Sequence, residues 1–312
     1  MIILLGENGQ VAREVLKATS AAGIPCRSVS SQEGDFNDPA KISDLLSECP
    51  PGSFVINAAA YTQVDLAESD RKAAIQINGL TPGVIASVCQ TRGLKLIHIS
   101  TDYVFSGNQQ RAYREHEPTG PLGVYGESKL LGERLILENL DQAIILRTSW
   151  VFSSHGKNFV KTMIRLGQDR DRLSVVADQI GGPTSAASIA KTCLELVAKT
   201  NSLSPTSDLW GVYHYCGKPS TTWHGFAEEI FRQTGQNVVV SPIRTDQYPT
   251  PARRPANSQL ACGKLQKNFE ISQPDWTIDL SRVVKELGFP TASAPDQPEC
   301  LTEPSKHQKV EA

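Results

Sequence analysis

Charge of one sign and long apolar runs are both scarce in this 312-residue sequence. Its 31 Lys and Arg nearly balance 33 Asp and Glu, so the formal net charge at pH 7 is −2. Nucleic-acid-binding domains are usually basic, so this balance argues against a nucleic-acid partner. No apolar stretch reaches the roughly 20 residues of a membrane-spanning helix. The run at residues 2–5 meets Gly6 without a basic segment before it, so we expect neither membrane insertion nor a signal peptide.

Cysteine is present, but in no pattern typical of a metal site or a disulfide framework. The seven cysteines are scattered and form no C-x-x-C pair: Cys26, Cys49, Cys89, Cys193, Cys216, Cys262 and Cys300. The six histidines also lack the spacing of zinc ligands, so we predict no metal site. Reduced thiols are typical of the cytoplasm, and we expect the protein to be cytoplasmic.

Short apolar segments alternate with helical segments through the first half of the chain. Strands are predicted at residues 2–5, 26–29, 54–56, 94–99 and 143–146, and helices at 10–22, 39–48, 81–91 and 125–137. This alternation predicts parallel strands joined by helices that cover both faces of the sheet. The predicted fold class is α/β, a Rossmann-type doubly wound parallel sheet with a smaller C-terminal substrate-binding domain.

A glycine loop joins the first predicted strand to the first predicted helix. Gly6 and Gly9, with Ala12 in the third position, follow a G-x-x-G-x-x-A spacing. Glycines let the backbone turn tightly and approach a pyrophosphate, which the dipole of the helix N-terminus stabilises. The loop therefore predicts a dinucleotide-binding site, and an ordinary turn is the weaker interpretation.

The segment after the second predicted strand bears on which dinucleotide binds. A carboxylate there would hold the ribose hydroxyls of NAD, but residues 27–31 (Arg-Ser-Val-Ser-Ser) contain none. Arg27 and the serines can accommodate a 2′-phosphate instead, so the predicted cofactor is NADPH or NADH. Asp35 and Phe36, which follow, can hydrogen-bond to and pack against an adenine.

Tyr125 and Lys129 stand four residues apart in a predicted helix, so their side chains share one face. A neighbouring ammonium favours a phenolate, and we expect the pKa of Tyr125 to lie below its usual value of about 10. Such a tyrosine can give a proton to a carbonyl oxygen while a hydride reaches the carbon. Thr101 ends the fourth predicted strand, where it can hydrogen-bond to the same oxygen. His98 in that strand is predicted to be a satisfied core histidine.

The second half of the chain is less regular. Helices are predicted at 158–166, 186–198, 223–233 and 279–287, strands at 173–176 and 211–215, and a loop over the Pro-rich stretch 242–274. We assign 1–150, together with 173–198, to an NAD(P)-binding domain and 151–290, discontinuously, to a sugar-nucleotide-binding domain. The polar tail 291–312 is expected to be disordered.

Six motifs along the chain carry a family resemblance. They are NAAAYT (57–62), STDYVF (100–105), YGESK (125–129), RTSWV (147–151), DQ-x-G-x-PT (178–184) and YPTPARRP-x-NS (248–258). With the glycine loop, they make the chain resemble the extended short-chain dehydrogenases/reductases. More narrowly, residues 1–288 resemble the dTDP-4-dehydrorhamnose reductase family.

This resemblance implies an enzymatic reaction and a set of contacts. The reaction is NAD(P)H-dependent reduction of the C4 keto group of dTDP-4-dehydro-6-deoxy-L-mannose to dTDP-L-rhamnose. Tyr125 would donate the proton, Lys129 would orient the nicotinamide ribose, and Thr101 would complete the catalytic set. Implied cofactor contacts, besides Gly6, are Gly9, Gln10, Val11, Asp35, Phe36, Ala60, Tyr61 and Thr62. Implied sugar-nucleotide contacts are Thr101, Asp102, Trp150, Asn158 and Arg253.

Other functions of such a fold fit the residues less well. A sugar-nucleotide 4,6-dehydratase needs a carboxylate base after Asp102, where this chain has Tyr103. A C4 epimerase is helped by a tight NAD site, which residues 27–31 do not favour. Two alternatives stay open: a non-catalytic NADP-binding regulatory subunit resembling methionine adenosyltransferase β, and a reductase of a related dTDP-4-keto-6-deoxysugar.

The resemblance also raises the questions of metal and subunit number. Some members of the family form homodimers with Mg²⁺ held by interface carboxylates. The stretch PTSAAS (183–188) has no acid, which leaves only Glu14 and Glu286 as candidates, so we predict no such site. The expected partner is a dTDP-sugar substrate, and the chain is expected to be a monomer or a homodimer.

Trp223 is expected to be a plain core aromatic.

Overall fold

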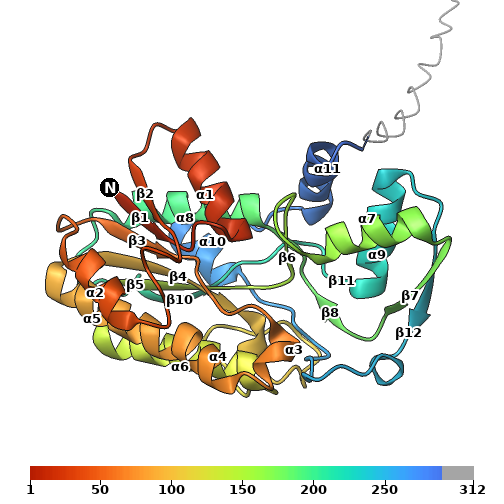
Figure 1. Cartoon of the computed structure of the whole chain (residues 1–312), viewed down its shortest axis with the longest axis horizontal. Coiled ribbons are helices and arrows are strands. Elements are labelled where there is room, and N and C mark those ends of the chain that lie inside the picture. The colour runs from red at the N-terminus through yellow and green to blue at the C-terminus, as the bar shows by residue number, and fades with distance from the viewer. Residues whose placement is uncertain (290–312) are drawn as a thin grey trace, which may run out of the picture.

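The computed structural model describes residues 1–289, and a six-stranded sheet forms its centre (Figure 1). The strand order is β10-β5-β4-β3-β1-β2, and every neighbouring pair is parallel. The strands are β1 (Ile2–Leu5), β2 (Cys26–Val29), β3 (Phe54–Asn57), β4 (Lys95–Thr101), β5 (Ala143–Thr148) and β10 (Gly211–His214). β2 is added on one side of β1 and β3 on the other, so the strand order reverses between β1 and β3, as in a doubly wound sheet. The tail predicted to be disordered lies outside the described residues.

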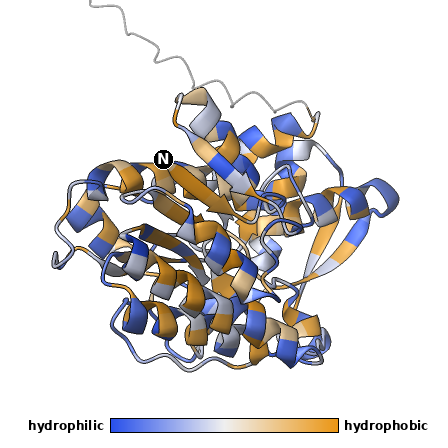
Figure 2. Cartoon of the chain, turned by 60° about the vertical axis from the view of Figure 1, so that its left-hand side comes forward, coloured by the Kyte–Doolittle hydropathy of each residue, from blue (hydrophilic) through white to orange (hydrophobic). Residues whose placement is uncertain are grey.

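The strands are continuous apolar runs because helices cover both faces of the sheet. All positions of β1, β3 and β5 are buried. Figure 2 shows the central strands mostly in the hydrophobic colour, whereas the surrounding helices carry both colours. This difference follows from burial of a strand on two faces and of an outer helix on one.

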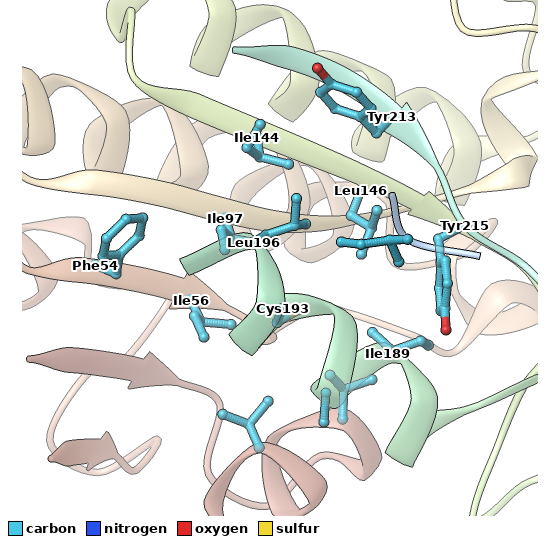
Figure 3. Packing of buried hydrophobic residues seen from close by; sticks show 14 of the residues in the cluster. Phe54, Ile56, Ile97, Ile144, Leu146, Ile189, Cys193, Leu196, Tyr213 and Tyr215 are labelled. Atoms are coloured by element: carbon cyan, nitrogen blue, oxygen red, sulfur yellow. The ribbon is translucent and has the colours of Figure 1, made fainter. Parts of the chain in front are cut away.

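One face of the sheet is covered by α1, α8 and α10, and the other by α2, α5 and α6 (Figure 1). Their bounds are α1 (Gln10–Ala21), α8 (Ala186–Thr200), α10 (Gly263–Phe269), α2 (Pro39–Ser47), α5 (Thr81–Arg92) and α6 (Val124–Asn139). In Figure 3, Ile189, Cys193 and Leu196 of α8 pack on Ile56 and Leu146 of the sheet. Within residues 1–289, no helix has both the length and the apolar content needed to cross a bilayer.

Residues 64–80, for which no element was predicted, form a run of short helices. They are α3 (Val64–Ala67), α4 (Arg71–Ile75) and the π-helix η1 (Gln76–Leu80), and all three pack against α6. Each is too short to show a helical period in the sequence. Asn78 in η1 is buried; its side chain bonds to both the backbone N–H and the carbonyl of Tyr61. The run therefore fixes the chain that leaves β3.

A second hydrophobic cluster lies beyond the sheet, around α7 (Phe159–Asp169), α9 (Trp223–Thr234) and α11 (Trp276–Glu286). These helices pack with the parallel pair β7 (Arg172–Val176) and β12 (Val239–Ile243). Residues 173–198 are divided: α8 packs on α1, but β7 pairs with β12 and is not a strand of the central sheet. The prediction that this strand belongs to the first domain is therefore corrected. β7 alternates buried and exposed residues, as a strand covered on one face does.

The remaining elements are short. They are η2 (Asp102–Val104), η3 (Thr245–Gln247), and the strand pairs β6 (Val151–Phe152) with β9 (Thr184–Ser185) and β8 (Ile180–Gly181) with β11 (Thr221–Thr222). The Pro-rich stretch 242–274, predicted to be a loop, contains the end of β12 and all of α10. Proline is tolerated in β12 because it pairs with only one neighbour. Leu265 and Phe269 anchor α10 against the sheet.

Candidate active site

A large pocket opens at the carboxyl ends of the central strands. Its volume is about 860 Å³, and residues after β1, β2, β3, β4 and β5 line it together with the start of α6. Ligands of doubly wound folds bind at this edge, next to the point where the strand order reverses. The topology therefore places a ligand site where the glycine loop and the predicted reaction centre meet.

The glycine loop forms one end of the pocket. Gly6 has a φ of 99°, and a Cβ added there would lie 2.7 Å from the backbone nitrogen of Ala59, so a side chain is excluded. Gly9 begins α1 without a side-chain cap, which leaves the first N–H groups of the helix free for an anion. Gln10 and Val11 also line the pocket. The loop thus fits the pyrophosphate of a dinucleotide.

The end of the pocket beyond β2 has the residues expected beside an adenosine. Ser31, Asp35 and Phe36 line it, as predicted for the last two. Arg27 does not line the pocket; its guanidinium forms an ion pair with Glu33. The interpretation of Arg27 as the group for a 2′-phosphate therefore loses support, because Arg27 lies at the start of β2 while the ligand edge is at its end.

Three elements bring Thr101, Tyr125 and Lys129 to the pocket. Thr101 ends β4, and its hydroxyl accepts the N–H of Tyr103 at 3.2 Å. Tyr125 lies in the first turn of α6 and Lys129 one turn later. A Cβ at Gly126 would lie 2.3 Å from the carbonyl oxygen of Tyr103, so this glycine lets α6 approach the end of β4. The three side chains are thus held by elements that are themselves tightly packed.

The protonation of the pair Tyr125 and Lys129 differs from our prediction. Burial raises the pKa of Tyr125 to about 12, although hydrogen bonding with Thr101 opposes the shift. Burial also lowers the pKa of Lys129 to about 8, with the charge of Glu133 acting in the opposite direction. The expectation of a lowered tyrosine pKa is therefore wrong, because burial disfavours the phenolate and the charge of Asp102 raises the pKa of Tyr125 further. Tyr125 keeps its proton at neutral pH and can donate it.

Asp102 is a buried carboxylate at the mouth of the reaction centre. It is 2% exposed, and its Oδ1 accepts the Thr101 hydroxyl at 3.0 Å. Among residues 1–289, its Oδ2 has no hydrogen-bond partner. Burial raises the pKa of Asp102 to about 6, and the hydrogen bond from Thr101 acts in the opposite direction. An unpartnered buried oxygen that lines a pocket can accept a hydrogen bond from a ligand hydroxyl.

The opposite wall of the pocket contains Trp150 in an unusual conformation. Its φ is 48°, which is rare outside glycine and costs backbone strain. Its indole stacks on Trp223, with ring centroids 3.6 Å apart and planes 10° apart. A Cβ at Gly181 would lie 2.6 Å from the Trp150 ring, so glycine is required beneath it. Trp223 is therefore a support for Trp150 as well as a member of the second cluster, which the sequence did not reveal.

The sequence matches the family model described as RmlD substrate binding domain over residues 1–289. A dTDP-4-dehydrorhamnose reductase of Burkholderia thailandensis is 40% identical over 297 residues, covering 92% of this chain and 98% of that protein. One of Shigella flexneri is 39% identical over 300 residues, covering 93% and 99%. The chain belongs to the dTDP-4-dehydrorhamnose reductase family.

Solved structures of the reductase family have the same fold. The reductase of Clostridium acetobutylicum aligns with a TM-score of 0.86 and 34% identity, covering 92% of this chain and 99% of that one. The reductase of Bacillus anthracis, solved in complex with NADP, aligns with a TM-score of 0.85 and 34% identity, covering 91% and 98%. These matches confirm the predicted Rossmann-type fold class and the family resemblance.

Three of the residues implied by the resemblance to this reductase family do not line the pocket. Tyr61 turns its hydroxyl to Asp70 at 3.3 Å. Asn158 caps α7 by accepting the N–H of Lys161 at 3.1 Å, and its amide donates to Gln10 at 2.9 Å. Arg253 is exposed. Their contacts with cofactor or substrate stay predictions, and the structure assigns other bonds to Tyr61 and Asn158.

The pocket also has lining residues that sequence reasoning missed. Gly156 and Lys157 reach it from the loop before α7, Gln63 from the residue before α3, and Ser149 from the end of β5. Lys157 is an exposed cation at the pocket, a position that we had given to Arg253. Its only signal in the sequence is its place directly before a predicted helix, which does not distinguish it from other surface lysines.

The two carboxylates considered for Mg²⁺, Glu14 and Glu286, lie on either side of an ammonium. Lys17 Nζ is 2.7 Å from Glu286 Oε1 and 4.0 Å from Glu14 Oε2. His155 Nε2 is 3.4 Å from the other oxygen of Glu14. The cluster therefore already holds one protein cation, Lys17, between its two carboxylates. Among residues 1–289, no group of three or more metal-ligating side chains is placed to hold a metal.

Proposed function

We propose that this protein is an NADPH- or NADH-dependent dTDP-4-dehydrorhamnose reductase. It would reduce the C4 keto group of dTDP-4-dehydro-6-deoxy-L-mannose and release dTDP-L-rhamnose. One observation carries the proposal: in a chain of the reductase family, Thr101, Tyr125 and Lys129 line the same pocket as a glycine loop shaped for pyrophosphate. Catalysis needs all of these together, whereas a subunit that only binds a dinucleotide needs the loop alone.

The residues of the pocket divide the chemistry among themselves. When bound, the nicotinamide cofactor supplies the hydride that reaches C4. Tyr125 donates the proton to the developing C4 oxygen, which its raised pKa favours because the hydroxyl stays protonated until then. Thr101 hydrogen-bonds to the same oxygen. Lys129 holds the nicotinamide ribose and lies one helical turn from the resulting phenolate.

The two parts of the chain bind the two ligands. Residues 1–150, together with α8, hold the dinucleotide through Gly6, Gly9, Gln10, Val11, Asp35, Phe36, Ala60 and Thr62. The remainder, up to residue 290, binds the sugar nucleotide. Asp102 accepts a sugar hydroxyl, and Trp150 packs on the sugar face. Lys157 is a cation that lines the pocket beside Gly156, where a Cβ would lie 3.3 Å from Gln10, so it is placed to contact a pyrophosphate.

Either reduced nicotinamide cofactor fits the residues around the adenosine end. Ser31 lines that end, and no cation of the second strand does so. The Bacillus anthracis relative was solved with NADP, which supports NADPH. We infer a cytoplasmic protein, since the six cysteines within residues 1–289 are all free thiols. We expect a monomer or a homodimer without a nucleic-acid partner.

A coupled test separates reduction from mere binding. The purified chain is mixed with dTDP-4-dehydrorhamnose and either NADPH or NADH, and loss of the reduced nicotinamide is followed by absorbance. We expect oxidation of at least one cofactor, and dTDP-L-rhamnose as the product by mass spectrometry and NMR. dTDP-glucose, which has no C4 keto group, is the control. Cofactor binding without turnover would overturn the proposal and favour a regulatory subunit.

A further inference from the structure

Lys129 is buried without a carboxylate of its own. It is 2% exposed, and its Nζ donates to the carbonyl of Ile99 at 2.7 Å. The carboxylate whose charge acts on Lys129 is Glu133, one turn further along α6. Arg147 occupies both oxygens of Glu133, at 2.9 Å from Nε and 2.6 Å from Nη2. The charge of Glu133 is therefore balanced by Arg147, and within residues 1–289 Lys129 forms no ion pair.

The second contact of Lys129 Nζ is Nε2 of His98, at 3.1 Å. His98 is fully buried in β4, and its other ring nitrogen, Nδ1, is 3.0 Å from Asn57 Nδ2. Burial and the charge of Lys129 both lower the pKa of His98 well below its ordinary value. The ring is therefore neutral and carries a proton on one nitrogen only.

The backbone decides which nitrogen of His98 carries that proton. The N–H of Ala59 donates to Asn57 Oδ1 at 3.1 Å. A backbone N–H can only donate, so the carbonyl oxygen of the Asn57 amide must face Ala59 and its NH₂ must face His98. Nδ1 of His98 thus accepts from Asn57, and the ring proton is on Nε2, pointing at Lys129.

An Nε2–H group cannot bond to an ammonium, which has no lone pair, but it can bond to a neutral amine. We propose that Asn57 and His98 are positioning residues that lower the proton affinity of Lys129 by directing a ring N–H at its amine. When Lys129 is unprotonated, the hydrogen bonds run in one direction, from the N–H of Ala59 through Asn57, His98 and Lys129 to the carbonyl of Ile99. Each bond of this series then joins one donor to one acceptor.

The remaining titratable groups around Lys129 come from α6 and η2. On α6 these are Tyr125, which keeps its proton, and Glu133, which raises the pKa of Lys129 but is itself paired with Arg147. From η2, Asp102 lines the same pocket; with a pKa of about 6 it is ionised at pH 7, so its charge favours the ammonium. Burial acts in the opposite direction and lowers the pKa of Lys129 to about 8. The ring N–H of His98 adds to the effect of burial.

This inference rests on the role proposed for Lys129, but its first test does not depend on catalysis. The full chain labelled with ¹⁵N-histidine reports the protonation of each ring nitrogen by NMR, and a His98→Gln variant identifies the signals. We expect His98 to be neutral at pH 7, with Nε2 protonated and Nδ1 unprotonated. A proton on Nδ1 would overturn the proposal even if the protein proves to be an active reductase.

An isosteric substitution at Asn57 reverses the direction of the hydrogen bonds from Asn57 through His98 to Lys129. In Asn57→Asp, one carboxylate oxygen still accepts the N–H of Ala59, while the other can only accept from His98. The ring proton should move to Nδ1, and Nε2 should then accept from a Lys129 ammonium. We expect the proton affinity of Lys129 to rise at least tenfold, which is one pH unit. The titration is followed through the His98 ¹⁵N shifts and the pH profile of kcat/KM.

Asn78→Asp is the matched control for the added charge. Asn78 is a buried asparagine that contacts Tyr61 and Ser128 but not His98. The Asn78→Asp variant should keep the ring proton of His98 on Nε2. An equal shift of the Lys129 titration in both variants, with an unchanged tautomer, would assign the effect to charge alone and overturn the proposal. If Asn57→Asp does not fold, the tautomer of the unmodified protein still decides.

Discussion

The two walls of the pocket are built in different ways. We define the sheet wall as Gly6, Thr101, Tyr125 and Lys129, which sit at the ends of long buried elements. The loop wall is Trp150, Gly156 and Lys157, which belong to the segment between β5 and α7 (Figure 1). Sheet-wall groups have their positions set by the packing of the core. Of the loop-wall groups, Trp150 stacks on Trp223 of the second cluster, and the loop of Gly156 and Lys157 is held by bonds from Ser153 and Asn158 to Gln10.

Under the proposed function, this difference separates catalysis, at the sheet wall, from substrate recognition, at the loop wall. On the sheet wall, Lys129 has a fixed set of polar partners, so its proton state is built into the fold. On the loop wall, Trp150 holds a strained backbone and depends on Trp223, while Lys157 is exposed. We therefore expect changes in the sheet wall to act on kcat and changes in the loop wall to act on KM for the sugar nucleotide.

The largest expected effect is on the sheet wall. Tyr125→Phe removes the proton donor, and general acid catalysis typically contributes ~10²- to 10⁴-fold. We expect kcat to fall by that factor while the Kd for NADPH, measured by fluorescence, changes little. Tyr113→Phe removes a buried hydroxyl outside the pocket and is the control. Turnover of Tyr125→Phe within tenfold of the unmodified protein would require another proton donor.

A pH-dependent effect is expected from Asp102, where the two walls meet. Its pKa is raised to about 6, so it is ionised above that pH and protonated below it. Because the ionised form is the better acceptor for a sugar hydroxyl, kcat/KM should fall about tenfold per pH unit below pH 6. Asp102→Asn should abolish this acidic limb, whereas Asp141→Asn, at a remote exposed turn, should keep it.

The pH dependence of the folding stability is a second way to measure the ionisation of Asp102. The pKa of Asp102 is raised in the folded state, so the folded protein binds its proton more tightly than the unfolded chain does. Stability therefore falls as pH rises from about 4 to about 6. Asn removes the cost of the buried charge, so the Tm of Asp102→Asn at pH 8 should not lie below that of the unmodified protein. A lower Tm at pH 8, with the acidic limb retained, would refute this role.

The smallest expected effect is on the loop wall. Trp223→Leu removes the stack beneath Trp150, and aromatic pairs contribute about 0.5–1.5 kcal/mol beyond their buried area. KM for the sugar nucleotide should rise roughly two- to tenfold with kcat nearly unchanged. Trp210→Leu, which disturbs a tryptophan of the sheet core, should lower Tm and leave KM alone. A large loss of kcat in Trp223→Leu would erase the distinction between the walls.

Prediction from sequence succeeded where local patterns are long. The central strands and their helices were found because continuous apolar runs and 3.6-residue periods are strong signals. Short elements such as α3, α4 and η1 were missed, since a few residues show no period. Within the site, motifs located Thr101, Tyr125 and Lys129. Lys157 was missed because an exposed lysine has no pattern until the fold brings it to a pocket.

The sequence by itself determined the doubly wound sheet, the glycine loop and the pairing of Tyr125 with Lys129. These depend on neighbours within a few residues or on the alternation of buried segments. Only the tertiary structure decided the protonation of the site and the partner of Trp150. The pKa of Tyr125 depends on burial by distant elements, and the stack with Trp223 joins residues 73 positions apart. Desolvation and packing are sums over three-dimensional neighbours, which local patterns do not contain.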